Sequence, residues 1–163
     1  MRVLGVDPGT ATTGFGLVEQ ESGKIRAVDY GCIRTSPDVP LSQRLHEVHE
    51  RIQRIIRDFR PDVVAVEQVF FNKNARSALQ VGQARGVVLL AANQSGLPVL
   101  EYTPLEVKMG VVGYGRASKR QIQSMVKVLL ALEDEPRPDD AADALAVALC
   151  CIHTETTLKE LRQ

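Results

Sequence analysis

With 163 residues, of which 44% are hydrophobic, the chain is long enough to bury the core of one globular domain and too short for two lobes. Its formal net charge is zero, and its three cysteines have no C-x-x-C spacing, so neither a disulfide framework nor a zinc site is predicted. The first residues alternate as a strand and a turn, and we identify no apolar run of membrane-spanning length, so we expect a soluble, unsecreted cytoplasmic protein without membrane contact.

The first third of the chain predicts three strands and a helix. Alternating apolar residues favour strands over Arg2–Asp7, Gly14–Val18 and Ile25–Ile33, with a hairpin turn between the last two. From Leu41 to Phe59 the apolar residues recur every three or four positions, which is the pattern of an amphipathic helix. We expect the three strands to pair as an antiparallel meander.

The rest of the chain alternates between short strands and helices. Thr103 and Ser118 have the side chains of helix N-caps, and the chain is expected to fray from about residue 154. This order predicts one α/β domain over residues 1–163, with a mixed sheet and helices on both faces. Strands are predicted over residues 62–67 and 98–102, and helices over 75–95, from 103, from 118 to about 132, and over about 139–153.

Four acids occupy positions that a folded chain could bring together. Asp7 and Glu67 end two predicted strands, and Asp140 and Asp143 lie one turn apart on the predicted last helix. Such a cluster repels itself unless cations are bound, and oxygen ligands without His or Cys suit Mg²⁺ or Mn²⁺. A pair of such ions is a common device for cutting phosphodiester bonds.

Each acid also has a purely structural interpretation. Asp7 before Pro-Gly is typical of a turn, and Glu67 could be a solvated strand end. Acids at 139 and 140 complement the dipole of a helix that begins there, and Asp139 is the expected cap. Asp143 is harder to explain in this way, because it shares a helix face with Asp140 inside an apolar stretch.

The zero net charge hides an uneven distribution. Residues 73–127 contain eight basic and two acidic residues, so the remainder of the chain is acidic. A basic middle beside scattered acids favours a nucleic-acid face with a metal pocket, although solvated helix faces explain part of it. Gly9 and Gly14, on either side of the turn after Asp7, are expected to leave space for a phosphate backbone.

Four motifs occur in order along nearly the whole chain: D-P-G-x-x-x-x-G from Asp7, E-Q-V-F from Glu67, K-N-A-R-S-A-L-Q-V-G-Q-A-R-G from Lys73, and D-A-A-D-A-L-A from Asp140. Each is weak alone, but together they are highly specific. The chain resembles the RuvC family of bacterial Holliday-junction resolvases. The resemblance implies an RNase H-like fold, with a five-stranded mixed sheet, in a homodimer that nicks two opposing strands of a four-way DNA junction.

The resemblance also implies roles for single residues. The metal ligands would be Asp7, Glu67, Asp140 and Asp143, although some relatives carry His where Asp140 stands. Two Mg²⁺ ions, which Mn²⁺ would replace, would activate a water and leave 5′-phosphate and 3′-hydroxyl ends. Phe70 would stack on an unpaired base, and Lys119 would also be catalytic. The residues implied to contact DNA are Phe70, Arg76, Lys108, Arg116, Lys119 and Arg120.

The resemblance further implies partners. The family uses the helix over 75–95 for its dimer, and here this helix contains Gly82 and Gly86, a spacing that more often serves tight packing inside one subunit. Partnership with a branch-migration motor of the RuvA and RuvB type is implied in the same way. The three histidines lie away from the motifs, and we expect structural or surface roles for His46, His49 and His153.

Two rival functions are left by the sequence. Asp7-x-Gly9-Thr10 also resembles the phosphate loop of actin-like ATPases and sugar kinases, but those proteins need two lobes to enclose a nucleotide. The second rival is a non-catalytic module that binds junctions, in which the acids only cap helices and face solvent. In such a module, Asp7→Asn would leave both the response to metal and DNA binding unchanged.

Overall fold

The computed structural model describes residues 1–68 and 75–161, with residues 75–77 and 159–160 described by their backbone alone. Within these ranges the elements follow the predicted order, with three strands first and three helices last. The elements are β1 (Arg2–Asp7), β2 (Thr12–Glu21), β3 (Lys24–Arg34), α1 (Leu41–Phe59), β4 (Val63–Glu67), α2 (Ala75–Gln94), β5 (Val99–Tyr102), α3 (Pro104–Val112), α4 (Lys119–Leu129) and α5 (Asp139–Leu161).

The five strands form one mixed sheet in the order β3-β2-β1-β4-β5. The first three strands pair antiparallel, which confirms the predicted meander, while β4 joins β1 and β5 joins β4 in parallel. The parallel register places Val6 opposite Val66, so β1 and β4 end side by side. Because strand ends in such sheets are where binding sites form, this edge is the first place to look for one.

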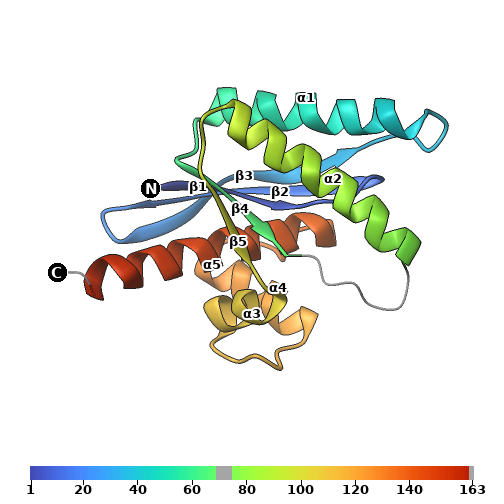
Figure 1. Cartoon of the computed structure of the whole chain (residues 1–163). Coiled ribbons are helices and arrows are strands. Elements are labelled where there is room, and N and C mark those ends of the chain that lie inside the picture. The colour runs from blue at the N-terminus through green and yellow to red at the C-terminus, as the bar shows by residue number, and fades with distance from the viewer. Residues whose placement is uncertain (69–74, 162–163) are drawn as a thin grey trace.

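Helices cover both faces of the sheet, as predicted (Figure 1). α1 and α2 pack on one face against a core that includes Leu4, Val6 and Val64, and we call this the α1–α2 face. α5 crosses the other face, with α3 and α4 beside it, against a core that includes Val3 and Ala65; we call this the α5 face. The strands are therefore buried on both sides, which explains the near-continuous apolar run before Glu67.

The two predicted caps hold the helices that border the α5 face. The Thr103 side chain accepts a hydrogen bond from the backbone N–H of Glu106, and the Glu106 carboxylate accepts one from the backbone N–H of Thr103. Ser118 and Gln121 form the same reciprocal pair at the start of α4. These capping boxes fix where each helix begins, and so they fix the position of Lys119 in the first turn of α4.

The last helix is longer than predicted. The sequence places its end near His153, but α5 continues to Leu161. Part of the reason is a contact that is remote in sequence, because the Thr156 hydroxyl donates a hydrogen bond of 2.9 Å to the side-chain oxygen of Gln20 at the end of β2.

The α5 helix is also long and apolar enough over Asp139–Leu158 to span a membrane by composition alone, a stretch that the sequence analysis did not recognise. In the structure, 61% of the apolar window is buried inside the protein, where α5 packs against the sheet. A core helix of a folded domain passes the same length test, and the structure gives α5 this role (Figure 1).

Candidate active site

The pleat of the sheet turns the two strand-end acids toward α5. Side chains alternate along a strand, so Asp7 lies on the same face as Val3, and Glu67 on the same face as Val63 and Ala65. Both acids are half-buried, at the ends of two neighbouring parallel strands. The sequence predicted that these residues end strands, and the pairing of β1 with β4 brings them to the same edge of the sheet.

Close contact between β2 and α5 brings the helical acids to the same edge. A Cβ atom at Gly14 would collide with the backbone carbonyl oxygen of Asp140, and one at Gly5 would collide with the carbonyl of Ala144. The expectation that Gly14 leaves space for a phosphate backbone was therefore wrong, because the helix backbone fills that space. The corresponding space at Gly9 is filled by the carbonyl of Thr12 within its own turn. Gly14 instead lets the first turn of α5 lie beside Asp7.

The acids raise one another's pKa values. The pKa of Asp7 is raised to about 7, first by burial and then by the charges of Asp143, Glu67 and Asp140. The pKa of Glu67 is raised by burial and by the charge of Asp143. Burial also raises the pKa of Asp143, against the opposing effect of its hydrogen bond from Lys119. Four acids that are predicted to bind metal thus share one electrostatic field.

Two lysines border this cluster. The Lys119 ammonium nitrogen lies 2.9 Å from Oδ2 of Asp143 and 3.4 Å from Oδ2 of Asp139. Burial acts to lower the pKa of Lys119, but the hydrogen bond and charge of Asp143 outweigh it, so the net pKa is raised. The charge of Lys108 lowers the pKa of Glu67. Both lysines line a pocket of about 200 Å³ together with Glu67 and Asp143.

A divalent cation fits this donor set by its chemistry. Carboxylate oxygens without His or Cys suit Mg²⁺ or Mn²⁺, and such an ion would relieve the repulsion that raises the pKa of Asp7 to about 7. Within residues 1–68 and 75–161, however, no three His, Cys, Asp or Glu side chains converge closely enough to hold an ion as they stand. As the structure stands, the Oδ2 atom of the Asp143 carboxylate accepts a hydrogen bond from Lys119.

Comparisons with known proteins identify the family. A family model described as "Crossover junction endodeoxyribonuclease RuvC" matches residues 3–151. The protein of that name from Pelotomaculum thermopropionicum is 56% identical over 162 residues, covering 99% of both chains. The chain belongs to the RuvC family. The Moorella thermoacetica member is 57% identical over 150 residues, which is 92% of this chain and 90% of the relative.

Solved structures agree with this assignment. The structure described as "T. thermophilus RuvC in complex with Holliday junction substrate" superimposes with a TM-score of 0.92 at 39% identity, covering 96% of both chains. The yeast mitochondrial Holliday junction resolvase superimposes with a TM-score of 0.71 at 15% identity, over 99% of this chain and 83% of the other, which shows the fold alone. The RNase H-like fold predicted from the RuvC motifs is confirmed.

The other residues that the RuvC resemblance implies to contact DNA are outside the described residues, described by their backbone alone, or exposed on the surface. Phe70 lies outside the described residues, as does Phe71. Arg76 belongs to the first turn of α2, and only its backbone is described. Arg116 in the loop between α3 and α4 is exposed, as is Arg120 in the first turn of α4. Neither Arg116 nor Arg120 lines the pocket that contains Glu67 and Asp143.

The histidines have the ordinary surroundings expected of them. A ring nitrogen of His49 lies 2.7 Å from the side-chain oxygen of Gln94, and one of His153 lies 2.7 Å from the backbone oxygen of Gly110. His46 is exposed on α1. These contacts join α1 to α2 and α5 to α3, and they are consistent with structural or surface roles.

Asp139 differs from its prediction as a helix cap. It is the first residue of α5, and its carboxylate accepts a hydrogen bond of 3.0 Å from the side-chain amide of Gln123 in addition to its contact with Lys119. The sequence did contain a signal for this role, because Asp139 precedes Asp143 by four residues and Lys119 precedes Gln123 by four. Residues four apart lie on the same side of a helix, so the two acids on one helix can face Lys119 and Gln123 on a neighbouring helix.

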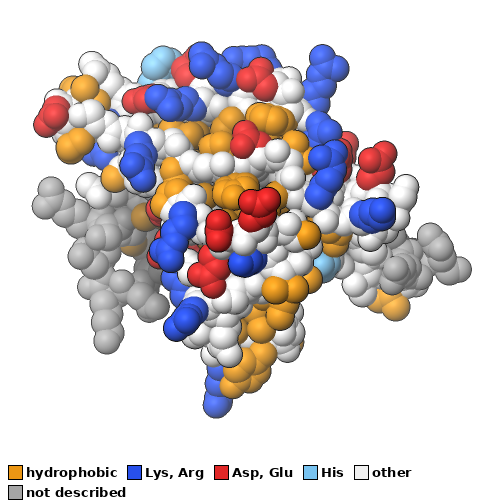
Figure 2. Space-filling model, turned by 180° about the vertical axis from the view of Figure 1, so that it is seen from behind, with side chains coloured by type: hydrophobic (Ala, Val, Ile, Leu, Met, Phe, Trp, Pro, Cys, Tyr) orange, Lys and Arg blue, Asp and Glu red, His pale blue; other side chains and the backbone are white. Residues whose placement is uncertain are grey.

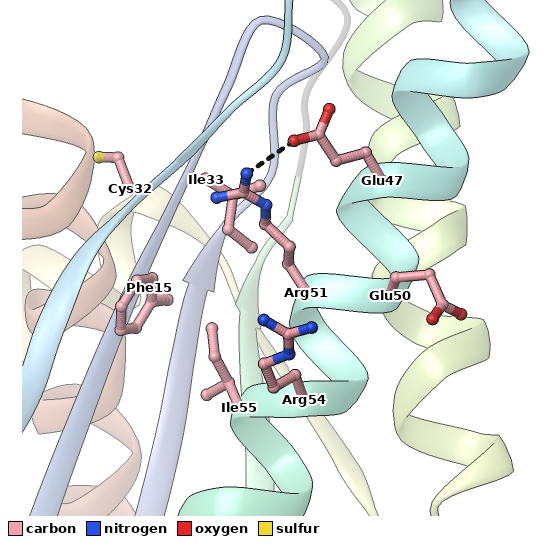
Figure 3. Close-up of a pocket in the computed structure, with 8 residues that line it drawn as sticks. All are labelled: Phe15, Cys32, Ile33, Glu47, Glu50, Arg51, Arg54 and Ile55. Carbon is pink, nitrogen blue, oxygen red and sulfur yellow. Dashed lines mark ion pairs between the residues drawn. The ribbon is translucent and has the colours of Figure 1, made fainter.

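A larger pocket of about 540 Å³ lies away from these acids, between α1 and the strands β2 and β3 (Figure 3). Its charged wall includes an ion pair of 2.8 Å between Arg51 and Glu47 on α1. Cys32 points to the opposite side of β3 from Ile33, as alternation along a strand requires. This pocket lacks the clustered acids and lysines of the sheet edge, so its size does not mark the active site.

The predicted basic middle does not produce a uniformly basic surface on the face drawn in Figure 2. Acidic and basic side chains lie interspersed there, with apolar side chains between them. The charge pattern therefore favours local sites where a few cations border acids, as around Lys119, over a broad basic track on this face.

Proposed function

We propose that this chain resolves four-way DNA junctions in recombination and repair by paired, symmetric, metal-dependent nicks that leave 5′-phosphate and 3′-hydroxyl ends. Its membership in the family of crossover junction endodeoxyribonucleases supports the class of reaction. One observation carries the assignment to this edge of the sheet: four acids and two lysines gather there. Burial and the charges of the other three acids raise the pKa of Asp7 to about 7, and Lys108 and Lys119 line a pocket with Glu67 and Asp143. A chain that only bound DNA would gain nothing from such a cluster.

The proposed ligands are Asp7, Glu67, Asp140 and Asp143, for two Mg²⁺ ions that Mn²⁺ can replace. Bound there, the ions supply an activated water and stabilise charge on the departing 3′ oxygen. Asp7 and Glu67 stand at the ends of two paired strands, which fixes the backbone that carries their carboxylates. Asp143 would bind the metal through the carboxylate whose Oδ2 atom accepts the hydrogen bond from Lys119. If Oδ2 itself bound the ion, the Lys119 ammonium group would be released and available to a phosphate oxygen.

Lys108 and Lys119 are proposed to bind the scissile phosphate, with Lys119 also stabilising transition-state charge. Their place in one pocket with Glu67 and Asp143 supports this role. Phe70 is proposed to stack on an unpaired base beside the cut. Positions on α2, on α4 and in the loop before α4 support phosphate contacts along the junction arms, which we assign to Arg76, Arg116 and Arg120.

A homodimer supplies the two active sites that paired cuts require. The exposed side of α2 supports α2 as the interface, because no atom of the described residues lies within 4 Å of a Cβ atom built at Gly82 or Gly86. The same side carries Leu79 and Leu90, which are 61% and 51% exposed. Tight packing inside one subunit, the more common role of this glycine spacing, is therefore not what these glycines do. Two copies of α2 could approach closely along this side.

The remaining assignments follow from the same proposal. The chain acts in the cytoplasm as one nuclease domain over residues 1–163, on junctions that a motor of the RuvA and RuvB type moves. Co-purification of the protein with such a motor tests the partnership, and persistent absence of any association counts against it.

The experiment for the proposed function compares a four-way junction with a linear duplex of the same sequence. The junction core is made mobile so that cuts can occur at preferred positions. In Mg²⁺ we expect paired nicks on the junction alone, which DNA ligase rejoins, and no nicks in EDTA. Binding of the junction without cuts in either Mg²⁺ or Mn²⁺ would instead establish the non-catalytic module.

A further inference from the structure

Lys119 has two carboxylate partners, and only one of them is a proposed metal ligand. Its ammonium nitrogen lies 2.9 Å from Asp143 and 3.4 Å from Asp139. Lys119 and Gln123 lie one turn apart on α4, while Asp139 and Asp143 lie one turn apart on α5. The first turns of the two helices therefore face each other with matching polar side chains.

Asp139 is fixed in this arrangement from its other side. Its Oδ1 atom accepts a hydrogen bond of 3.0 Å from the side-chain amide of Gln123, and its Oδ2 atom faces Lys119. Both side chains of the ion pair are about half exposed, at 53% for Lys119 and 52% for Asp139. Attraction alone is therefore weak, and the fixed geometry of the carboxylate matters more than its charge.

Metal binding creates a conflict at Asp143. The oxygen that accepts the hydrogen bond from Lys119 belongs to a carboxylate that the proposed function assigns to a cation. If this oxygen turned to that cation, Lys119 would lose its shorter contact and would be repelled by the added positive charge. A long lysine side chain without an anchor would then sample many rotamers in solvent.

The geometry points to Asp139 as a positioning residue that keeps the Lys119 ammonium group beside the scissile phosphate after Asp143 has turned to the metal. Gln123 holds the Asp139 carboxylate in place for this purpose. This inference rests on the proposed function, because it requires Asp143 to bind metal and Lys119 to contact the phosphate. Asp139 itself touches neither metal nor DNA in this arrangement.

A double-mutant cycle separates this role from a general effect on α5. The measured quantity is the single-turnover rate of junction cutting with saturating protein and Mg²⁺, and thermal unfolding verifies that each variant is folded. We expect Asp139→Ala to slow cutting about tenfold and Gln123→Ala about threefold, with junction affinity unchanged. In a Lys119→Ala background, Asp139→Ala should change the rate less than about twofold, because its effect passes through the lysine.

Two further variants serve as controls for the cycle. Asp139→Glu should restore most of the rate, since it returns a carboxylate to the same place. Asp134→Ala removes an exposed acid from the linker before α5 and should leave the rate unchanged. The inference is overturned if Asp139→Ala has no effect, or if its slowing persists in full without Lys119, as loss of helix stability would produce.

A second readout does not depend on cutting. The ¹⁵N signal of the Lys119 ammonium group, followed without DNA, reports whether the group stays hydrogen-bonded when Mg²⁺ is added. We expect the signal to persist in the wild-type protein and to disappear in Asp139→Ala. Its loss in the wild type on adding Mg²⁺, or its persistence in the variant, contradicts the inference. If the wild-type protein cuts no junction at all, the proposed function fails first.

Discussion

The two faces of the sheet are built differently, and the proposed active-site acids lie on only one of them. On the α1–α2 face, the strands present branched side chains such as Leu4, Val6 and Val64, and the helices pack at the distance these side chains set. On the α5 face, Gly5 and Gly14 present no side chain, so the backbone of α5 comes into direct contact with the strands. The close contact places helical carboxylates next to strand-end carboxylates, which a helix at ordinary distance could not do.

This difference shows how the fold overcomes the repulsion within its own site. Burial and neighbouring charges raise the pKa of Asp7 to about 7, which means that the folded state disfavours the charged form of this carboxyl group. The α5 helix cannot move away, because its buried residues Leu145, Leu149 and Ile152 are embedded in the core of the same face. The packing of the apolar residues of α5 therefore holds the acids together. The α1–α2 face carries none of the proposed site acids, so its packing does not have to oppose such a repulsion.

The largest expected effect comes from adding one methyl group to the close contact. Gly14→Ala would collide with the Asp140 carbonyl and push the first turn of α5 outward. We expect a loss of about 3 kcal/mol in unfolding free energy and at least a hundredfold slower cutting per folded molecule. Urea unfolding and single-turnover cutting measure the two effects.

The matched control is Gly82→Ala on the open side of α2, where nothing lies within 4 Å of the added Cβ atom. The fold should keep its stability or gain up to about 1 kcal/mol, since Ala favours a helix. Equal damage from both substitutions would contradict the difference between the two faces. Sedimentation at decreasing concentration shows separately whether Gly82→Ala weakens the dimer, as an interface on α2 predicts.

A second pair of substitutions tests whether the α5 core holds the site. Leu145→Ala on α5 and Ile52→Ala on α1 each remove a fully buried side chain. Both should lower the unfolding free energy by about 2–4 kcal/mol. Only Leu145→Ala should also slow cutting, because α5 carries two of the proposed active-site acids and α1 carries none of them. Equal rates for the two variants under conditions where both are folded would show that the site tolerates movement of α5.

The repulsion itself is measurable as a dependence of stability on pH. In EDTA the folded protein keeps a proton on Asp7 up to about pH 7, while the unfolded chain loses it near its ordinary pKa of about 4. The unfolded state therefore binds fewer protons between these values, and stability falls as pH rises through this window. Asp7→Asn should then be more stable than the wild type at pH 8, on the order of 2–4 kcal/mol.

Mg²⁺ supplies the control for this prediction. The wild-type protein should gain stability with increasing Mg²⁺, because the folded state binds the ion, while Asp7→Asn should gain much less. An Asp7→Asn protein that is less stable than the wild type in EDTA at pH 8 would mean that the acids are not in repulsion. Urea unfolding at pH 5 and pH 8, with and without Mg²⁺, gives all four values.

The smallest expected effect concerns Lys108. Its charge lowers the pKa of Glu67 and it lines the same pocket as Glu67, but within residues 1–68 and 75–161 it forms no ion pair like the 2.9 Å contact of Lys119 with Asp143. Lys108→Ala should slow cutting about tenfold, less than Lys119→Ala. Single-turnover rates of both variants decide the order. The reverse order would assign the main phosphate contact to α3 in place of α4.

Much of this architecture could be predicted from the sequence because the signals are local. The alternation of residues 2–7 and the period of α1 determine those elements, and the capping residues Thr103 and Ser118 mark the start of α3 and α4. Asp7 and Glu67 could be proposed as a pair because both acids end predicted strands and both belong to motifs that resemble the RuvC family.

The features that the sequence did not reveal depend on contacts between remote segments. The space beside Gly14 was assigned to DNA, because no local pattern shows that α5 fills it. The end of α5 was placed too early, since a contact with Gln20 lies far away in sequence. Asp139 was predicted to cap α5, and its partners on α4 became visible only when the two helices were placed side by side.

The most direct test of the central claim measures binding and cutting of the same mobile junction by Asp7→Asn in Mg²⁺. If the acids on the α5 face form a metal-dependent nuclease centre, the variant binds the junction at least as tightly as the wild type, because one repelling charge is gone. It should make no detectable cuts, and Glu67→Gln should behave in the same way. Cutting by Asp7→Asn within about tenfold of the wild-type rate would contradict the account, because such a residue contributes little to the transition state.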